Sequence, residues 1–335
     1  MSDDLKSRCA IGLVTRDGER DIVGCVQSIV SQTEPPAEII WIDNASSDET
    51  LELVRRRFPD FAQPEIMAEN TGFCAAHNRA FERSHAPYYL ALNQDAFLAP
   101  GYIERICDWM DENPSLGAVS GLILDTAVAD VDADANVYSA GMAVSRGRVP
   151  YEIHMGRPPN IWDRDRRLVP AVTGAAIIVR RDAVRQVRGN IEPLFPEEFF
   201  AYFEEVDLAL ALARGGFRCG VEGAALAWHA ARGQGGRYDH ELRYHYFKNH
   251  WLLSLRHDSW LDWLREAPQL LRGEWSFYKD QYRAQPKAFV RATAFALNRL
   301  FSRPARVAVG NDPTESAKGR AAFFDLSRKL LRQTR

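Results

Sequence analysis

The first hundred residues alternate short apolar segments with segments of helical periodicity, and this alternation restricts the fold more than any other feature. Residues 9–14, 38–42, 66–68 and 88–92 are short and apolar, as expected of buried strands. The segments between them place apolar residues on one helical face: Ile22, Val26, Ile29 and Val30, then Leu51, Val54 and Phe58, then residues 72–84. This order predicts right-handed βαβ units, and therefore an α/β fold with a mostly parallel sheet flanked by helices.

Polar clusters follow each of these predicted strands. They are Thr15-Arg16-Asp17, Asp43-Asn44, Asn70-Thr71-Gly72 and Asn93-Gln94-Asp95. Ligands of open α/β sheets gather at the carboxyl ends of the strands. The sequence therefore predicts one ligand site built from these clusters.

The rest of the chain differs in composition and in its pattern of apolar residues. Residues 117–124 and 171–180 are predicted strands, and residues 125–165 between them are irregular and rich in Asp, Arg and Pro, as an active-site or acceptor-side loop is. Residues 244–299 have a helical pattern. They carry aromatic residues among basic ones: Trp251, Trp260, Trp263, Trp275, Phe277 and Tyr282. We expect a catalytic domain over residues 1–235 and a helical, basic and aromatic extension over residues 236–335.

Charge is unevenly distributed along the chain. The formal net charge is −3, which gives no signal for nucleic acid, but residues 237–335 carry 19 Lys and Arg against 10 Asp and Glu. Two interpretations of this basic extension stay open. Its helices pack on the catalytic domain, or its basic and aromatic residues lie on an anionic membrane beside a lipid-linked acceptor. Association with a second copy of the chain is also open.

Targeting and redox signals are weak. The start, Met1-Ser2-Asp3-Asp4, lacks the pattern of a secretory signal, and no apolar run is long enough to span a bilayer. We expect a cytoplasmic location, with contact to the inner face of the cytoplasmic membrane as one alternative. The five cysteines are scattered and contain no CxxC pair, so they are expected to be reduced packing residues.

The polar clusters have side chains suited to a nucleotide and a metal ion. Asp43 can accept hydrogen bonds from a base or a ribose, whereas Asp48 is better placed to cap the next helix. Gly72 permits close approach of the backbone at a helix start, which favours a diphosphate. Asp95 can ligate Mg²⁺ or Mn²⁺ that neutralises a diphosphate, with Asn93 as a neutral second contact.

A second acidic cluster, Glu204-Glu205-Val206-Asp207, follows the aromatic run Phe199-Phe200-Ala201-Tyr202-Phe203. A carboxyl group held against apolar rings has a raised pKa, which suits a general base that works near neutral pH, and we favour Glu205. Asp207 is as consistent with a structural role at the first turn of a helix. His229 follows an apolar strand, and only its position after the acidic cluster favours a role as metal ligand.

Together these motifs resemble the family 2 inverting glycosyltransferases of GT-A fold, and most of all the rhamnosyltransferase-like branch that builds bacterial surface polysaccharides. The resemblance covers roughly the first 235 residues. Its motifs are Ile11-Gly12-Leu13-Val14-Thr15, Ile42-Asp43-Asn44-Ala45-Ser46-Ser47-Asp48, Asn70-Thr71-Gly72-Phe73-Cys74-Ala75-Ala76-His77-Asn78, Leu92-Asn93-Gln94-Asp95, Val172-Thr173-Gly174-Ala175-Ala176, Phe203-Glu204-Glu205-Val206-Asp207-Leu208 and Trp228-His229.

The resemblance implies a role for each matching residue. Thr15, Asp43 and Asn44 would hold the nucleoside, Gly72 and Asn78 would shape the donor pocket, and Gly174 and Ala175 would line the sugar. Asp95 and His229 would ligate Mg²⁺ or Mn²⁺, and Glu205 would be the catalytic base. The donor would be a sugar carried on dTDP, UDP or GDP, with rhamnose as the favoured sugar. The acceptor would be a glycan or a polyprenyl-linked glycan. Two departures concern Asn93, where the family often has a first aspartate, and Glu205, where an aspartate is common.

Two other classes of protein stay open. A sugar-nucleotide nucleotidyltransferase also uses a metal and carboxylates, but residues 12–18 are a poor version of its Gly-rich, basic loop. A non-catalytic module that binds nucleotide-sugars or glycans would need neither Glu205 nor Asp95. A nucleic-acid-binding role rests only on the basic extension and ranks last.

Overall fold

The computed structural model describes most of the chain. The described residues are 7–126, 135–145, 147–162, 164–189, 193–230, 240–259, 285–302 and 313–333, together with positions 261, 262, 265, 266, 268, 279 and 283. The aromatic residues Trp260, Trp263, Trp275, Phe277 and Tyr282 of the predicted basic extension lie outside this part, whereas Trp251 is half-buried in a helix.

The strand and helix alternation predicted for the first hundred residues is confirmed. The elements are β1 (Cys9–Thr15), α1 (Ile22–Val30), β2 (Glu38–Asp43), α2 (Thr50–Arg57), β3 (Glu65–Ile66), α3 (Gly72–Arg83) and β4 (Tyr88–Asn93). The third strand is shorter and slightly earlier than expected, because only Glu65 and Ile66 pair with the end of β2. Asp48 precedes the cap residue of α2 and accepts a hydrogen bond from the first helical amide, Thr50 N, at 3.0 Å.

The second part of the chain mixes strands of both directions with helices. Its elements are β5 (Ala96–Leu98), α4 (Tyr102–Glu112), β6 (Leu116–Asp125), β7 (Val137–Ser139), β8 (Met142–Val144), β9 (Pro150–Glu152), a 3₁₀ turn (Pro159–Ile161), β10 (Arg166–Val169), β11 (Ala176–Arg180), α5 (Arg181–Arg188), a 3₁₀ turn (Glu197–Phe199), α6 (Glu204–Arg214) and β12 (Arg218–His229).

Two expectations for this part are corrected. Residues 125–165 are not wholly irregular, because they contain β7, β8 and β9; strands of three residues are too short to give a periodic signal. The strand predicted over residues 171–180 begins only at Ala176, because residues 173–175 turn along the cavity described below.

One sheet organises the molecule. Its strand order is β10-β12-β6-β11-β4-β1-β2-β3, with β5 paired to β12 and β7 paired to β6. β1, β2, β3 and β4 are mutually parallel, and β6 and β12 share their direction because β11 pairs antiparallel with both β4 and β6. Six of the ten strands therefore run one way, as the prediction of a mostly parallel sheet required.

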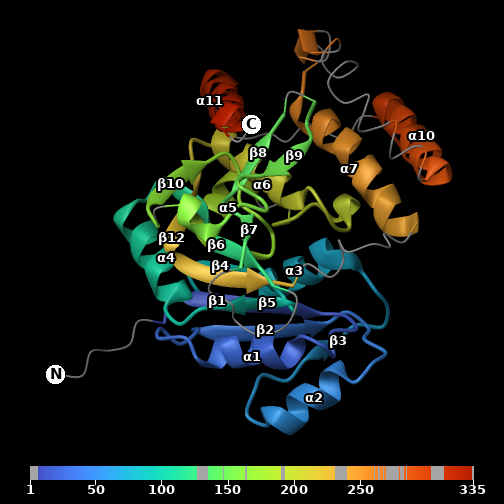
Figure 1. Cartoon of the computed structure of the whole chain (residues 1–335). Helices are drawn as coiled ribbons and strands as arrows, with labels where there is room; N and C mark the ends of the chain where they lie inside the picture. Colours follow the sequence, from blue (N-terminus) through green and yellow to red (C-terminus); the bar gives the residue numbers. More distant parts are fainter. Residues whose placement is uncertain are drawn as a thin grey trace.

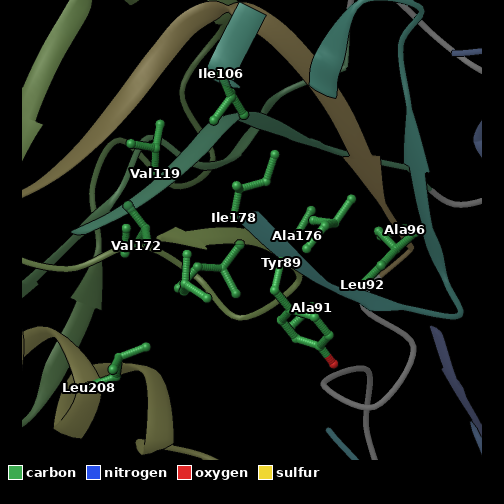
Figure 2. Close-up of a cluster of buried hydrophobic side chains, with 14 of the residues drawn as sticks. Tyr89, Ala91, Leu92, Ala96, Ile106, Val119, Val172, Ala176, Ile178 and Leu208 are labelled. Carbon is green, nitrogen blue, oxygen red and sulfur yellow. The ribbon is translucent and has the colours of Figure 1, made fainter. Parts of the chain in front are cut away.

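The core lies between this sheet and its flanking helices. Figure 2 shows part of it, where Ile106 of α4, Val119 of β6 and Ile178 of β11 belong to one cluster of buried side chains. All three are completely buried. Each such side chain stabilises the fold by roughly 1.5–3 kcal/mol, so this cluster fixes the strands whose ends carry the site.

The C-terminal helices are α7 (His240–His257), α10 (Pro286–Ser302) and α11 (Pro313–Gln333), and Figure 1 shows them on the side of the molecule away from α1 and α2. Leu252 and Leu253 of α7 and Phe323 of α11 join the same core as the sheet. A Cβ atom at Gly319 would lie 1.9 Å from the Ala213 carbonyl oxygen, so α11 approaches α6 as closely as only glycine allows. These helices pack on the sheet domain, and the domain boundary near residue 235 stays a prediction. No helix in the described part is both long and apolar enough to cross a membrane.

Candidate active site

The register of the parallel strands brings predicted polar residues to one edge of the sheet. β1 pairs with β2 so that Thr15 lies beside Asp43, and with β4 so that Val14 lies beside Asn93. The strands therefore end level with one another. Because all three run in the same direction, their carboxyl ends form a single edge, as parallel βαβ units require.

The other side of this edge comes from much later in the sequence. β5 pairs with β12 so that Ala96 lies beside His229. The Ala230 amide also donates to the Asp95 carbonyl oxygen at 2.9 Å. These backbone contacts place His229 next to Asp95, although the two residues are 134 positions apart in the sequence. The order of the motifs alone does not establish this proximity.

The residues predicted to hold the nucleoside form hydrogen bonds with one another. The Thr15 hydroxyl donates to Asp43 Oδ1 at 2.8 Å, and the Ser46 amide donates to Asp43 Oδ2 at 2.9 Å. Asn44 joins the end of β2 to the start of α3, because its Oδ1 accepts from the Thr71 amide at 2.9 Å. All three predicted residues are buried and shape the turn after β2.

Gly72 and Asn78 are placed at and within α3, and both act on neighbouring backbone. Gly72 has φ +84°, and a Cβ atom there would lie 2.5 Å from the Phe200 ring. The Asn78 amide donates to the Phe195 carbonyl oxygen at 2.7 Å, and its Oδ1 accepts from the Phe195 amide at 2.9 Å. Both residues hold the segment that precedes the acidic cluster against α3.

A cavity of about 530 Å³ opens at the same edge of the sheet. It brings together the predicted residues Asn93, Asp95, Gly174, Ala175, Glu204, Glu205 and His229. Thr15, Asp43, Asn44, Gly72 and Asn78 do not line it. The remaining walls are largely apolar and aromatic: Phe73, Tyr138, Met142, Val149, Pro150, Tyr151, Met155, Ala201, Tyr202, Phe203 and Tyr246, with Glu152 and Thr173.

One wall of the cavity carries a donor set that fits a divalent cation. His229 Nε2 lies 3.2 Å from Asp95 Oδ1 and 3.4 Å from the Asn93 amide nitrogen. The described residues contain no cluster of three or more His, Cys, Asp or Glu able to hold a metal. One carboxylate and one imidazole are enough where phosphate oxygens and water complete the shell, as at sites that bind a metal together with a diphosphate.

Another part of the cavity wall carries the acidic cluster at the start of α6. The residues just before it adopt left-handed backbone: φ is 67° at Phe200, 73° at Tyr202 and 71° at Phe203. Such a conformation in non-glycine residues costs about 1–3 kcal/mol each and is found mostly at functional sites. Gly174 faces this wall, since a Cβ atom there would lie 3.7 Å from Glu204 Oε1.

Burial changes the acidity of both carboxyl groups of this cluster. Burial raises the pKa of Glu205 to about 7, although backbone amides at the helix start and the Glu204 side chain act in the opposite direction. Burial, and then the charge of Glu205, raise the pKa of Glu204 well above its usual value. Glu204 thus holds a proton more strongly than Glu205. At neutral pH the pair has one group able to accept a proton.

The sequence did not single out Glu152, which is a third carboxyl group in the cavity. Burial raises the pKa of Glu152 to about 8, against the effect of the Ser139 and Thr173 hydroxyls. Its buried Oε2 atom, like those of Glu204 and Glu205, has no hydrogen-bond partner among the described residues. Glu152 ends the short strand β9, inside the segment expected to be an active-site loop, so the region was indicated but the residue was not.

Asp207, for which two roles were open, has a structural environment. It is completely buried, and its two carboxylate oxygens accept hydrogen bonds from Arg188 at 2.7 Å and from Arg256 at 2.8 Å. His257 Nε2 lies 2.7 Å from the same carboxylate. The neighbouring cations hold the pKa of Asp207 well below its usual value despite burial. This network joins α5, α6 and α7 and lies outside the cavity lining.

Comparisons with known proteins agree with this geometry. The family model described as glycosyl transferase family 2 matches residues 11–188. The N-acetylglucosaminyl-diphospho-decaprenol L-rhamnosyltransferase of Mycobacterium tuberculosis (strain ATCC 25618 / H37Rv) is 28% identical over 270 residues, which cover 73% of this chain and 83% of that protein.

Two solved structures share the fold. GalNAc-T7 with UDP, GalNAc and Mn²⁺ has a TM-score of 0.60 at 12% identity; the match covers 92% of this chain and 59% of that one. The mannosyltransferase PcManGT from Pyrobaculum calidifontis, in complex with GDP-Man and Mn²⁺, has a TM-score of 0.52 at 19% identity, covering 97% of this chain and 85% of that one.

The family match covers more than half of the chain and contains the carboxyl ends of β1, β2 and β4. Glu204, Glu205 and His229 lie beyond it, and the cavity joins them to Asn93 and Asp95 within it. The mixed α/β architecture and the solved structures confirm the predicted GT-A fold. This chain belongs to glycosyl transferase family 2 and is a glycosyltransferase.

Proposed function

We propose that this glycosyltransferase moves a sugar, rhamnose first, from a nucleoside diphosphate to a hydroxyl of a lipid-linked glycan, with inversion at the anomeric carbon. One observation carries the proposal: the Asp95–His229 pair and the Glu204–Glu205 pair, whose pKa values are raised, line the same cavity of about 530 Å³ at the carboxyl edge of the sheet. The relative from Mycobacterium tuberculosis, whose name specifies rhamnose and a decaprenol-linked acceptor, supports the choice of sugar and acceptor.

Glu205 is proposed as the general base. Its pKa of about 7 lets it be ionised near neutral pH and still take a proton from an acceptor hydroxyl. The hydroxyl oxygen then attacks the anomeric carbon from the face opposite the diphosphate, and the bond from that carbon to the diphosphate oxygen breaks. A single displacement inverts the configuration. Glu204, which keeps its proton more strongly, is left to donate a hydrogen bond beside it.

The leaving group is proposed to lie against Asp95 and His229. A divalent cation held by these two residues would neutralise the negative charge that develops on the departing diphosphate. Asn93 adds a neutral polar contact beside His229. Mn²⁺ is present in both solved structures described above, which supports a divalent cation here without fixing the ion.

Thr15, Asp43 and Asn44 are proposed to face the nucleoside. They lie at the same carboxyl edge of the sheet as Asn93, which lines the cavity. Gly174 and Ala175 are proposed to line the sugar, because both border the cavity. dTDP, UDP and GDP are the candidate nucleotides.

The α10 helix offers a surface for a membrane that carries the acceptor. Its inner face packs on α7 through Ala288 and Ala292. Its outer face exposes Val290 and Leu297, at 60% and 52%, beside the exposed Lys287. Apolar and basic side chains on one helix face favour binding to an anionic bilayer.

Full-length protein should co-sediment with anionic liposomes more than with neutral ones, and a Val290→Glu, Leu297→Glu double variant should lose this binding. Failure of the wild type to bind would refute the membrane contact.

A transfer assay tests the proposed reaction. Purified protein would be incubated with dTDP-rhamnose, UDP-sugars or GDP-sugars and a polyprenyl-diphosphate-linked N-acetylglucosamine acceptor, with and without Mn²⁺. We expect one donor to give a glycosylated lipid and the free nucleoside diphosphate, only with the divalent ion. Release of pyrophosphate from a nucleoside triphosphate and a sugar phosphate would instead favour a nucleotidyltransferase. Donor binding without transfer to any acceptor would favour the binding module.

A further inference from the structure

The loop that leads into the acidic cluster is held by a helix from the C-terminal part of the chain. Residues 199–203 contain three left-handed non-glycine residues, Phe200, Tyr202 and Phe203. A backbone of this kind persists only where surrounding contacts stabilise it. The loop ends at Glu204, the first residue of α6, so its conformation sets where the Glu204 and Glu205 side chains lie.

A single buried side chain of α7 makes three polar contacts with this loop. The Asn249 side-chain nitrogen donates to the carbonyl oxygens of Phe199 at 2.9 Å, Ala201 at 2.7 Å and Tyr202 at 2.7 Å. Asn249 is completely buried. Because three carbonyl oxygens face this amide, only its NH₂ group can point toward the loop. Loss of the Asn249 amide would remove one donor from each of these carbonyl oxygens, although the Phe199 oxygen also accepts from the Ala201 amide at 2.8 Å. A typical intramolecular hydrogen bond contributes about 0.5–1.5 kcal/mol to stability.

Neighbouring α7 residues hold the aromatic rings of the same loop. His245 stacks on Phe200 with ring centroids 4.4 Å apart and an interplanar angle of 12°. Tyr246, which also lines the cavity, meets the Phe203 ring edge-on at 5.0 Å. One face of α7 thus contacts both the rings and the carbonyl oxygens of the loop.

We infer that Asn249 is a positioning residue for the proposed base. It acts through the carbonyl oxygens of Phe199, Ala201 and Tyr202 to fix the start of α6. The inference rests on the proposed function for the role of Glu205. The contacts of Asn249 with the loop do not depend on the proposed function. Helix α7 then positions the proposed base and is more than an appended extension.

Hydrogen exchange and pH–rate profiles of full-length variants test this inference. Asn249→Asp keeps the side-chain shape but places an acceptor against three carbonyl oxygens. His245→Ala leaves Asn249 in place and removes the stacking on Phe200, together with the contact of His245 Nδ1 with Lys248 Nζ at 3.1 Å. Ser254→Ala is the matched control, since Ser254 is also buried in α7 but bonds to Asp258 at 2.5 Å, away from the loop.

We expect Asn249→Asp to speed exchange of the amides of residues 199–205 by at least ~10-fold, with a smaller effect in His245→Ala and none in the control. The acidic limb of kcat should shift by about one pH unit, a change that general destabilisation would not cause, while KM for the donor stays within about 2-fold. If Asn249→Asp does not fold, His245→Ala carries the comparison.

Two results would overturn the inference. Exchange of residues 199–205 that matches the control would show that Asn249 does not hold the loop. Faster exchange with an unchanged pH profile and kcat would show a purely structural contact. Absence of sugar transfer by the wild type would refute the proposed function instead, and the exchange comparison would still decide whether Asn249 holds the loop.

Discussion

Glu204 and Glu205 are adjacent in sequence, yet their surroundings separate their acidities. Burial raises the pKa of both, and the charge of Glu205 raises that of Glu204 further, whereas backbone amides at the helix start favour the ionised form of Glu205. This asymmetry assigns one proton acceptor to a pair of chemically identical groups. Because the two groups interact, the protons leave in steps that belong to the pair.

The pair predicts the pH dependence of turnover. A base with a pKa of about 7 is protonated and inactive below that value, so kcat should rise with pH and level off above about 8. Replacing the partner, as in Glu204→Gln, removes a group that interacts with Glu205 and should shift the midpoint without abolishing transfer. Steady-state rates between pH 5 and 9 measure both. A flat profile through this range would exclude a carboxyl base of raised pKa.

Asn93 predicts how strongly the protein holds its cation. The present donor set has one carboxylate, Asp95, and one imidazole, His229. Asn93→Asp adds a second carboxylate next to His229 and should lower the Mn²⁺ concentration for half-maximal activity by roughly 10-fold. Asp95→Asn should raise it by a similar factor or more. Titration of activity with Mn²⁺ measures the shift, and equal Mn²⁺ dependence in all three proteins would refute this site.

At the scale of the elements, α5, α6 and α7 are tied together by the buried carboxylate of Asp207. Its pKa is well below the usual value because Arg188, Arg256 and His257 surround it. Its contribution to stability is full above the unfolded pKa of about 4 and is lost as pH falls through the lower folded value. Burial also lowers the pKa of His257, so protonation of this imidazole opposes folding as pH falls below about 6.5.

Asp207→Asn should therefore lower the free energy of unfolding at pH 7 by about 3–5 kcal/mol, because two arginines are left buried without their full partner. The loss should shrink at about pH 2, because the contribution of Asp207 decreases only as pH falls below the unfolded pKa of about 4. Glu65→Gln is a suitable comparison, since Glu65 pairs with the exposed Arg79 and should cost less than about 1 kcal/mol. Urea unfolding at the two pH values gives the numbers. Equal losses in the two variants would contradict the network.

The local pattern of the sequence predicted elements where periodicity was strong. The strands up to β4 are short, continuous apolar runs and the helices between them follow an apolar repeat of 3.6 residues. The common direction of β1, β2 and β4 aligned Thr15, Asp43 and Asn93. Strands β7, β8 and β9 escaped detection because three residues give no period. Glu152, at the end of β9, escaped for the same reason, although the segment was expected near the site.

At the scale of the whole molecule, contacts between distant segments decide what local patterns leave open. The pairing of β5 with β12 joins Asp95 to His229, and the resemblance to a known family, more than any local pattern, indicated that pair. Nothing near Asn249 in the sequence indicates that its amide holds a loop 48 residues earlier. The same packing makes α7 part of the site, since Tyr246 of this helix lines the cavity.

The rate of sugar transfer by Glu205→Gln, measured at saturating donor and acceptor, tests the central claim most directly. Gln keeps the size of the side chain but cannot take a proton at neutral pH. We expect kcat to fall by about 10²–10⁴-fold, while the nucleotide-sugar still raises the Tm of the variant as much as that of the wild type. Near-normal turnover by Glu205→Gln would contradict the account and would move the base role to another carboxyl group of the cavity.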